Sequence, residues 1–202
     1  MAEVKLSPRR ALHDFASPGM FGNRNRPPGV RVCEFASAAS VLILPKPGSL
    51  QHCSNRCAKK FGAEFPEAGR ASQGNGVAIV WAAPREWIAV GTEGNAVGLT
   101  AGLAEMFGAD AAVVDQSDSR ILLSLEGERI RDFLAKGIAL DLDSSVFPPL
   151  SAAHTHFHGI GVTLWRSGEE FLLLFPRSYA QSLWHLVEIS AAEYGLEFSC
   201  AP

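Results

Sequence analysis

Apolar and polar positions alternate along the chain in two periods, and both periods recur from residue 30 onward. Short stretches in which every second residue or every residue is apolar, such as VRVCEF and EFLLLF, predict strands, because side chains along a strand point to opposite faces. Nine strands are expected, at residues 30–35, 41–44, 77–83, 86–91, 112–117, 121–127, 151–158, 161–166 and 170–175, and LEF at 196–198 is expected to add an edge strand.

Four longer stretches with apolar residues three or four positions apart predict helices at residues 49–61, 96–107, 128–136 and 179–194. Gly62, Gly137 and Gly195 mark three of their ends, because glycine readily adopts the left-handed cap. Strands and helices in this mixed order predict an α+β fold rather than a doubly wound parallel sheet. A hairpin followed by a helix occurs twice, which predicts one α+β module at residues 30–114 and a second at 115–202, meeting near residues 108–118.

The first 29 residues are predicted to form an extended N-terminal arm. They are rich in proline and glycine, with NRNRPPG near their end, and show no sustained apolar period. Two interpretations stay open: a disordered tail, and an arm that becomes ordered along a partner.

Length and charge narrow the classes of function. A chain of 202 residues can bury a core without disulfides, and a formal net charge of −3 offers no basic surface for nucleic acid. The longest apolar runs, 77–83 and 171–175, are far shorter than the roughly 20 residues that cross a bilayer. The stretch MAEVKLSPRRALHDF lacks the apolar segment of a secretory signal. A cytoplasmic, membrane-free protein is therefore expected.

The surface and the thiols fit this picture. Cys33, Cys53, Cys57 and Cys200 are expected to be reduced thiols rather than a disulfide framework. Charged residues make up 19% of the chain, below the roughly 25% typical of soluble domains. This composition suits both a surface partly covered by partners and a somewhat apolar monomer.

Three alternate histidines in HTHFH, His154, His156 and His158, are the first candidate for chemistry. On a strand they would share one face, which suggests a metal site. Alternate residues lie about 6.7 Å apart along a strand, so the outer two would be about 13 Å apart and at most two can share an ion. No further ligand is evident, and histidines on a polar strand face are the favoured interpretation.

The other candidates also favour structural roles. Cys53 and Cys57 in HCSNRC stand four apart on a predicted helix, which is not the spacing of a zinc knuckle. Neither a GxSxG elbow nor a GxGxxG or GxxxxGK[ST] phosphate loop occurs. Asp115, Asp118 and Arg120 could form an acid with its counterion, but DQSDS is also typical of a β-turn.

The aromatic residues add a last candidate. Four tryptophans could form a stacking site for a ligand, although each falls in an apolar pattern that favours core or interface: Trp81, Trp87, Trp165 and Trp184.

Three stretches together resemble a known family, the gamma subunit of heterotetrameric sarcosine oxidase. They are WAAPREWIAV, VVDQSDSRILLSLEGERIRDFLAKGIALDL and TLWRSGEEFLLLFPRSYAQSLWHLVE, and the likeness covers about residues 30–195. The resemblance implies a fold like that of the folate-binding domains of the glycine-cleavage T-protein, an aminomethyltransferase. In that enzyme an acidic residue in a glycine-containing strand takes part in the chemistry, whereas the corresponding stretch here, HGIGVTLWR, supplies no carboxylate.

The resemblance also implies a function. The complex demethylates sarcosine oxidatively to glycine, passes electrons from FAD through FMN to oxygen, and hands the one-carbon unit to tetrahydrofolate. FAD, FMN, NAD and tetrahydrofolate belong to the partner subunits in this family, and the partners are the alpha, beta and delta subunits. The family assigns the gamma chain no catalytic, cofactor-binding or metal-binding residue. The chain alone is thus expected to be a non-catalytic subunit of an oxidoreductase acting on CH–NH donors.

Two other hypotheses are weighed beside this one. An autonomous folate-dependent one-carbon transferase follows from the superfamily pattern, and a small metal enzyme would use HTHFH. Both need a convergent set of reactive groups, which the spacing of residues does not display.

Overall fold

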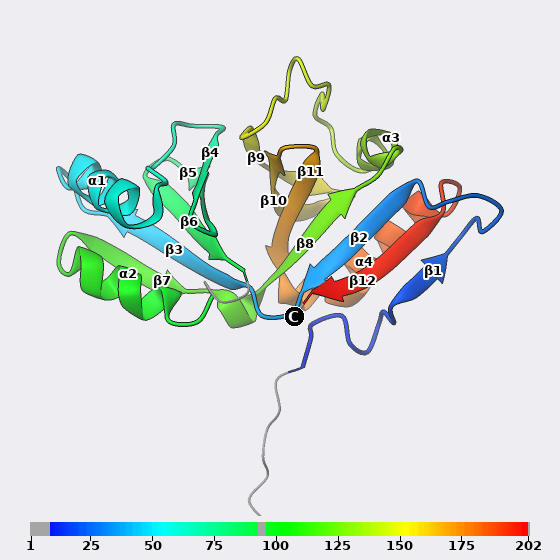
Figure 1. The fold of residues 1–202 in the computed structure, drawn as a ribbon, viewed down its shortest axis with the longest axis horizontal. Helices are drawn as coiled ribbons and strands as arrows, with labels where there is room; N and C mark the ends of the chain where they lie inside the picture. Colours follow the sequence, from blue (N-terminus) through cyan, green and yellow to red (C-terminus); the bar gives the residue numbers. More distant parts are fainter. Residues whose placement is uncertain (1–8, 93–95, 202) are drawn as a thin grey trace, which may run out of the picture.

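The computed structural model describes residues 9–92 and 96–201, and their strands form two sheets (Figure 1). The seven-stranded sheet has the order β1-β12-β2-β8-β11-β10-β9, and the five-stranded sheet the order β4-β5-β6-β3-β7. The strands of the first are β1 Gly19–Phe21, β2 Val30–Phe35, β8 Arg120–Glu126, β9 Ala152–Phe157, β10 Ile160–Ser167, β11 Glu170–Pro176 and β12 Leu196–Ala201. Those of the second are β3 Ala39–Pro45, β4 Ala71–Gly74, β5 Val77–Ala83, β6 Glu86–Gly91 and β7 Ala111–Asp115.

Helices cover one face of each sheet. The helices α1 (Leu50–Phe61) and α2 (Leu99–Phe107) pack on the five-stranded sheet, and α3 (Ile130–Ala135) and α4 (Ala180–Ala191) pack on the seven-stranded sheet. Figure 1 shows the first pair with its sheet on the left and the second pair with its sheet on the right. Among the described residues, no helix combines the length and the hydrophobicity needed to cross a bilayer.

The two uncovered faces pack against each other. On β5, Ile79 points to the helices while Val80 enters an apolar cluster shared by both sheets. On β8, Leu123 likewise points to the helices and Leu122 enters the shared cluster. The layers therefore run helix, sheet, sheet, helix, which explains why these strands are apolar at almost every position rather than at every second one.

The α+β fold class is confirmed, with two sheets and four helices within residues 9–92 and 96–201. The nine predicted strands and the hairpins at residues 77–91 and 161–175 are present, while β1, β4 and the full length of β12 go beyond the prediction. The expectation that LEF forms an edge strand is wrong: β12 lies between β1 and β2 and pairs parallel with β2 from Leu196↔Val30 to Ala201↔Phe35. A parallel partner distant in sequence leaves no local turn signal.

Sheet membership also differs from the order of elements along the chain. The stretch 30–35, which the sequence assigned to the first module, is a strand of the seven-stranded sheet together with most of residues 115–202. In the N-terminal segment, residues 19–21 pair with β12, and Leu12 is fully buried in the core beneath the seven-stranded sheet. Parts of the segment 9–29, around Leu12 and at residues 19–21, therefore pack on this chain's own sheet.

Candidate functional site

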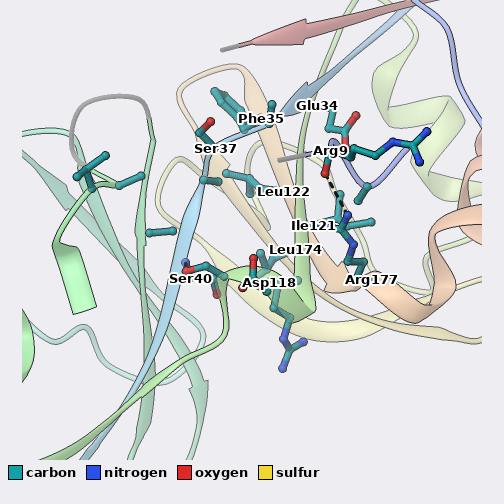
Figure 2. Close-up of a pocket in the computed structure, with 18 residues that line it drawn as sticks. Arg9, Glu34, Phe35, Ser37, Ser40, Asp118, Ile121, Leu122, Leu174 and Arg177 are labelled. Atoms are coloured by element: carbon teal, nitrogen blue, oxygen red, sulfur yellow. Dashed lines mark hydrogen bonds between the residues drawn. The ribbon is translucent and has the colours of Figure 1, made fainter. Parts of the chain in front are cut away.

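A cavity of about 600 Å³ lies where the chain passes between the two sheets. Its walls come from the β2–β3 turn, from the ends of β8 and β11, and from the short 3-10 helix η2 (Ser117–Ser119) that links β7 to β8. Figure 2 shows Arg9, Glu34 and Arg177 on one side of the cavity and Ser37 and Ser40 on the other.

The chain passes from one sheet to the other between β2 and β3 and returns between β7 and β8. These two connections are hydrogen-bonded to each other beside this cavity. The amide of Ser40, just after the first crossing, donates to Oγ of Ser117 at 3.1 Å, and the amide of Gln116 donates back to the carbonyl of Ser40 at 2.7 Å. The sequence predicted one meeting point near residues 108–118, whereas the junction pairs that segment with the β2–β3 turn.

Asp115 serves the turn that makes the second crossing. Its carboxylate accepts from the hydroxyl of Ser117 at 2.6 Å, from the amide of Ser117 at 2.9 Å and from the hydroxyl of Thr100 at 2.8 Å. The hydroxyl of Ser117, followed by its amide, lowers the pKa of Asp115 below its usual value. These contacts match the turn chemistry expected from DQSDS.

Two of the three arginines that line the cavity are bound to neutral groups, and the third, Arg9, pairs with Asp14 at 2.8 Å. Nε of Arg120 donates to Oε1 of Gln116 at 3.2 Å, and burial lowers the pKa of Arg120. A second guanidinium, that of Arg177, donates to the backbone carbonyl of Arg9 at 3.1 Å (Figure 2). Asp118 lines the same cavity with an exposed side chain. The structure does not bring Asp115, Asp118 and Arg120 together as an acid with its counterion, because Asp115 and Arg120 each bond other groups.

Glu34 is a buried carboxylate on the cavity wall, with 2% of its surface exposed. It accepts from Nη1 of Arg10 at 3.2 Å and from the amide of Leu12 at 3.0 Å, so it holds the N-terminal segment on the sheet. By contrast, Oγ of Ser40 is buried and has no hydrogen-bond partner among the described residues. A buried hydroxyl without a hydrogen-bond partner is costly, so the Ser40 hydroxyl is a polar group that a bound molecule could pair with.

The predicted histidine row is divided between a strand and a turn. His154 and His156 lie exposed on β9, and His158 begins the β9–β10 turn with φ of 48°. Nδ1 of His154 is 3.4 Å from Oγ1 of Thr163, and Nε2 of His158 is 3.0 Å from Oγ of Ser190. In the described part of the chain, no three of His, Cys, Asp and Glu are grouped so that they could hold a metal ion.

The four cysteines are free thiols. Cys53 and Cys57 lie on α1 and are fully buried in the core under the five-stranded sheet. Burial raises the pKa of Cys57 to about 12, which leaves the thiol protonated and a poor nucleophile at neutral pH.

The four tryptophans do not gather at one ligand site: Trp81 and Trp87 form a cross-strand pair on β5 and β6, while Trp165 and Trp184 lie elsewhere. Trp87 stacks on Phe65 with ring centroids 4.9 Å apart, and its Nε1 donates to the carbonyl of Pro66 at 3.0 Å. Trp184 packs in the core beneath α4, and Trp165 lies between the sheets.

Two buried ionic groups were missed by sequence reasoning, Glu34 and Arg166. Arg166 is 2% exposed and donates to the carbonyls of Gly168 and Phe147 and to Oε1 of Glu169. The available signal was the presence of a charged residue inside an apolar strand pattern, since such residues are buried only when they are paired.

Two solved structures resemble the fold described above. The crystal structure of the glycine cleavage system aminomethyltransferase T from Bartonella henselae matches with a TM-score of 0.62 and 16% identity, over 85% of this chain and 48% of that chain. The heterotetrameric sarcosine oxidase from Corynebacterium sp. U-96, solved in complex with pyrrole 2-carboxylate, matches with a TM-score of 0.73 and 26% identity, over 82% of this chain and 85% of that chain. The class of protein is therefore an α+β domain of the kind found in aminomethyltransferase T and in sarcosine oxidase.

Sequence relatives narrow the class to one family. The model of the sarcosine oxidase gamma subunit family matches residues 53–193. The sarcosine oxidase subunit gamma of an Arthrobacter species is 31% identical over 72% of this chain and 71% of its own length. That of Corynebacterium sp. strain P-1 is 30% identical over 96% of this chain and 93% of its own length. The chain belongs to the sarcosine oxidase gamma subunit family.

Proposed function

We propose that this chain is the non-catalytic gamma subunit of a heterotetrameric sarcosine oxidase and that it supports assembly with alpha, beta and delta subunits. In this proposal the complex demethylates sarcosine to glycine and passes the one-carbon unit to tetrahydrofolate. FAD, FMN, NAD and tetrahydrofolate are held by the partner subunits. Membership of the family and the likeness to a heterotetrameric enzyme support the assignment.

One observation carries the non-catalytic role: most of the ionisable groups at or beside the main cavity are used to join parts of this chain, whereas Asp118 is exposed on the cavity wall. Asp115 bonds the η2 turn, Arg120 bonds Gln116, Arg177 bonds the backbone of Arg9, and Glu34 bonds the N-terminal segment. General acid and base catalysis needs groups that are free to meet a substrate. Groups that already bridge two elements contribute position rather than proton transfer.

The mouth of the same cavity is the surface we propose for docking. Val97, which lines the cavity, is 88% exposed, and the hydroxyl of Ser40 inside has no partner in the described structure. A larger subunit of the oxidase would cover the apolar side chain and supply an acceptor or donor to the hydroxyl. The proposal rests on these two residues of one cavity wall, an apolar side chain exposed to solvent and a buried hydroxyl without a partner in the described structure.

The test is coexpression with the partner subunits, comparing Val97→Glu with Val146→Glu. Val146 is also exposed, at 59%, but does not line the cavity, so it controls for added charge and lost valine. Val97→Glu should weaken complex formation about tenfold or more in size exclusion at micromolar protein, because a charge would be buried at the contact. Equal assembly by both variants would refute the docking surface. Separate elution of the unmodified chain from its partners would refute the assembly role itself.

An autonomous folate-binding transferase is the second candidate, favoured by a cavity large enough for a small molecule. Calorimetry of the isolated chain with tetrahydrofolate distinguishes the two proposals. Heat of binding at millimolar ligand, with an aminomethyl donor turned over, would favour the transferase.

A further inference from the structure

A second cavity, of about 380 Å³, lies between the sheets. Most of its lining residues differ from those of the first cavity. Its floor is the inner face of the β10–β11 hairpin, with Trp165, Ser167, Glu170 and Leu172. Its roof is the tight β4–β5 hairpin, and Oγ of Ser167 donates to Oε1 of Gln73 across the gap at 3.1 Å. The cavity is thus bounded by two paired hairpins, which are rigid supports.

Two polar groups stand on the floor, Trp165 and Glu170, and the first lacks the partner that its burial calls for. Trp165 is 1% exposed, and in the part of the chain that the structure describes its indole Nε1–H meets no acceptor. Trp165 pairs with Leu172 and Ser167 pairs with Glu170, so Trp165 and Glu170 are diagonal neighbours on one face, about 7–8 Å apart at Cα. The floor therefore presents a donor and a carboxyl group side by side.

The carboxyl group of Glu170 stands in an environment that favours its neutral form. Desolvation is the main cause that raises its pKa, the hydroxyl of Ser124 acts against it, and the charge of Glu126 adds to the rise. None of the described residues lining this cavity is a lysine or an arginine. A cation brought in by a ligand would supply the missing counter-charge.

The walls fit the same class of ligand. The faces of aromatic rings attract cations, and Phe35 and Trp165 both line the cavity. The volume lies within the range of sites for small molecules, and the remaining walls combine apolar side chains such as Val77, Val90 and Leu122 with polar ones from the β4–β5 hairpin. An anionic ligand would find one acid and no base among the lining residues, and a purely apolar ligand would leave the indole N–H of Trp165 unpaired.

We infer that this cavity is a binding site for a small organic ammonium compound that also carries a hydrogen-bond acceptor. Glu170 pairs with the ammonium group, the rings of Phe35 and Trp165 contact its alkyl groups, and Nε1 of Trp165 donates to the acceptor. The inference goes beyond the assembly role, because it assigns this chain a ligand of its own.

Choline is the probe, since it combines a methylated ammonium group with a hydroxyl acceptor. Its neutral counterpart of the same shape is 3,3-dimethyl-1-butanol. Titrations of the full chain followed by calorimetry and by ligand-observed NMR should show choline binding in the millimolar range and the neutral alcohol binding about tenfold or more weakly. Equal binding of the two would overturn the inference, as would no binding of choline at all.

A matched pair of variants locates the effect. Glu170→Gln removes the charge and keeps the shape, while Glu105→Gln makes the same change on the exposed face of α2, away from the cavity. Glu170→Gln should weaken choline about tenfold, and Glu105→Gln should leave it unchanged. Choline binding that survives in Glu170→Gln would overturn the assignment. If that variant fails to fold, the comparison of choline with the neutral alcohol on the unmodified chain still decides the question.

Discussion

Replacing Phe133 with alanine tests the framework role of the stretch from residue 113 to residue 142. Phe133 lies on α3, has no exposed surface, and packs against Phe157 of β9 with ring centroids 5.6 Å apart. The substitution removes a whole ring from the core beneath the seven-stranded sheet, where neighbours relax only partly around the cavity. A loss of about 3–5 kcal/mol in the free energy of unfolding is expected.

The size of the chain converts this loss into an observable shift. At roughly 2–4 °C per kcal/mol for a domain of this length, Tm should fall by roughly 6–20 °C. Equilibrium unfolding in urea should show a lower midpoint with an unchanged slope, because the folded state still buries nearly the same surface. Phe133→Leu should give a smaller loss, since it fills part of the cavity.

Asp118→Asn is the control, because this side chain is exposed on the η2 turn. Surface changes of this kind usually stay within about 0.5 kcal/mol. If Asp118→Asn proved more costly than Phe133→Ala, the charges of the stretch would be its important feature, and the framework interpretation would be refuted.

Two further predictions concern single ionisable groups. Because burial raises the pKa of Cys57 to about 12, a thiol reagent at pH 8 should leave Cys57 unmodified in the native chain and label it once denaturant is added; rapid native labelling of α1 in a peptide map would contradict this. Hydrogen bonds from Ser117 lower the pKa of Asp115 in the folded state, so its stabilisation is present above its ordinary pKa of 3.8 and is lost as pH falls through the folded value. Asp115→Asn should therefore lower the free energy of unfolding by about 1 kcal/mol at pH 7, and by progressively less below pH 4, in denaturant titrations across that range. A loss of stability that grows as the pH falls would contradict the lowered pKa of Asp115.

Local patterns in the sequence were enough for most of the elements. Strands such as EFLLLF and VAIVWAA are apolar at nearly every position because both of their faces are buried, one under helices and one under the other sheet. The turn chemistry of DQSDS was equally predictable, since Asp115 bonds a residue only two positions away.

Long-range pairing could not be predicted in the same way. The strand 30–35 reads like any other, and only its parallel pairing with β12 and its antiparallel pairing with β8 place it in the seven-stranded sheet. The short strand β1 has no apolar alternation of its own and exists because β12 offers it an edge. Neither partner is marked in the sequence near residue 20 or 30.

The candidate sites were beyond the reach of the sequence for a related reason. Ser40 and Trp165 are important because their polar atoms are buried without partners, which depends on what packs around them. The diagonal arrangement of Trp165 and Glu170 depends on the register of the β10–β11 hairpin, which is fixed by the two-residue turn Gly168–Glu169 between the paired residues Ser167 and Glu170.

The position of β12 between β1 and β2 also affects how the protein is made. On the ribosome, the first strands of the seven-stranded sheet emerge long before the strand that joins them, so their hydrogen-bonding edges stay open until synthesis has reached residues 196–201. The five-stranded sheet has no such delay, because all of its strands lie between residues 39 and 115. In nascent chains the five-stranded sheet should therefore form first. The seven-stranded sheet should remain incomplete, and exposed to chaperones and proteases, until β12 has been synthesised.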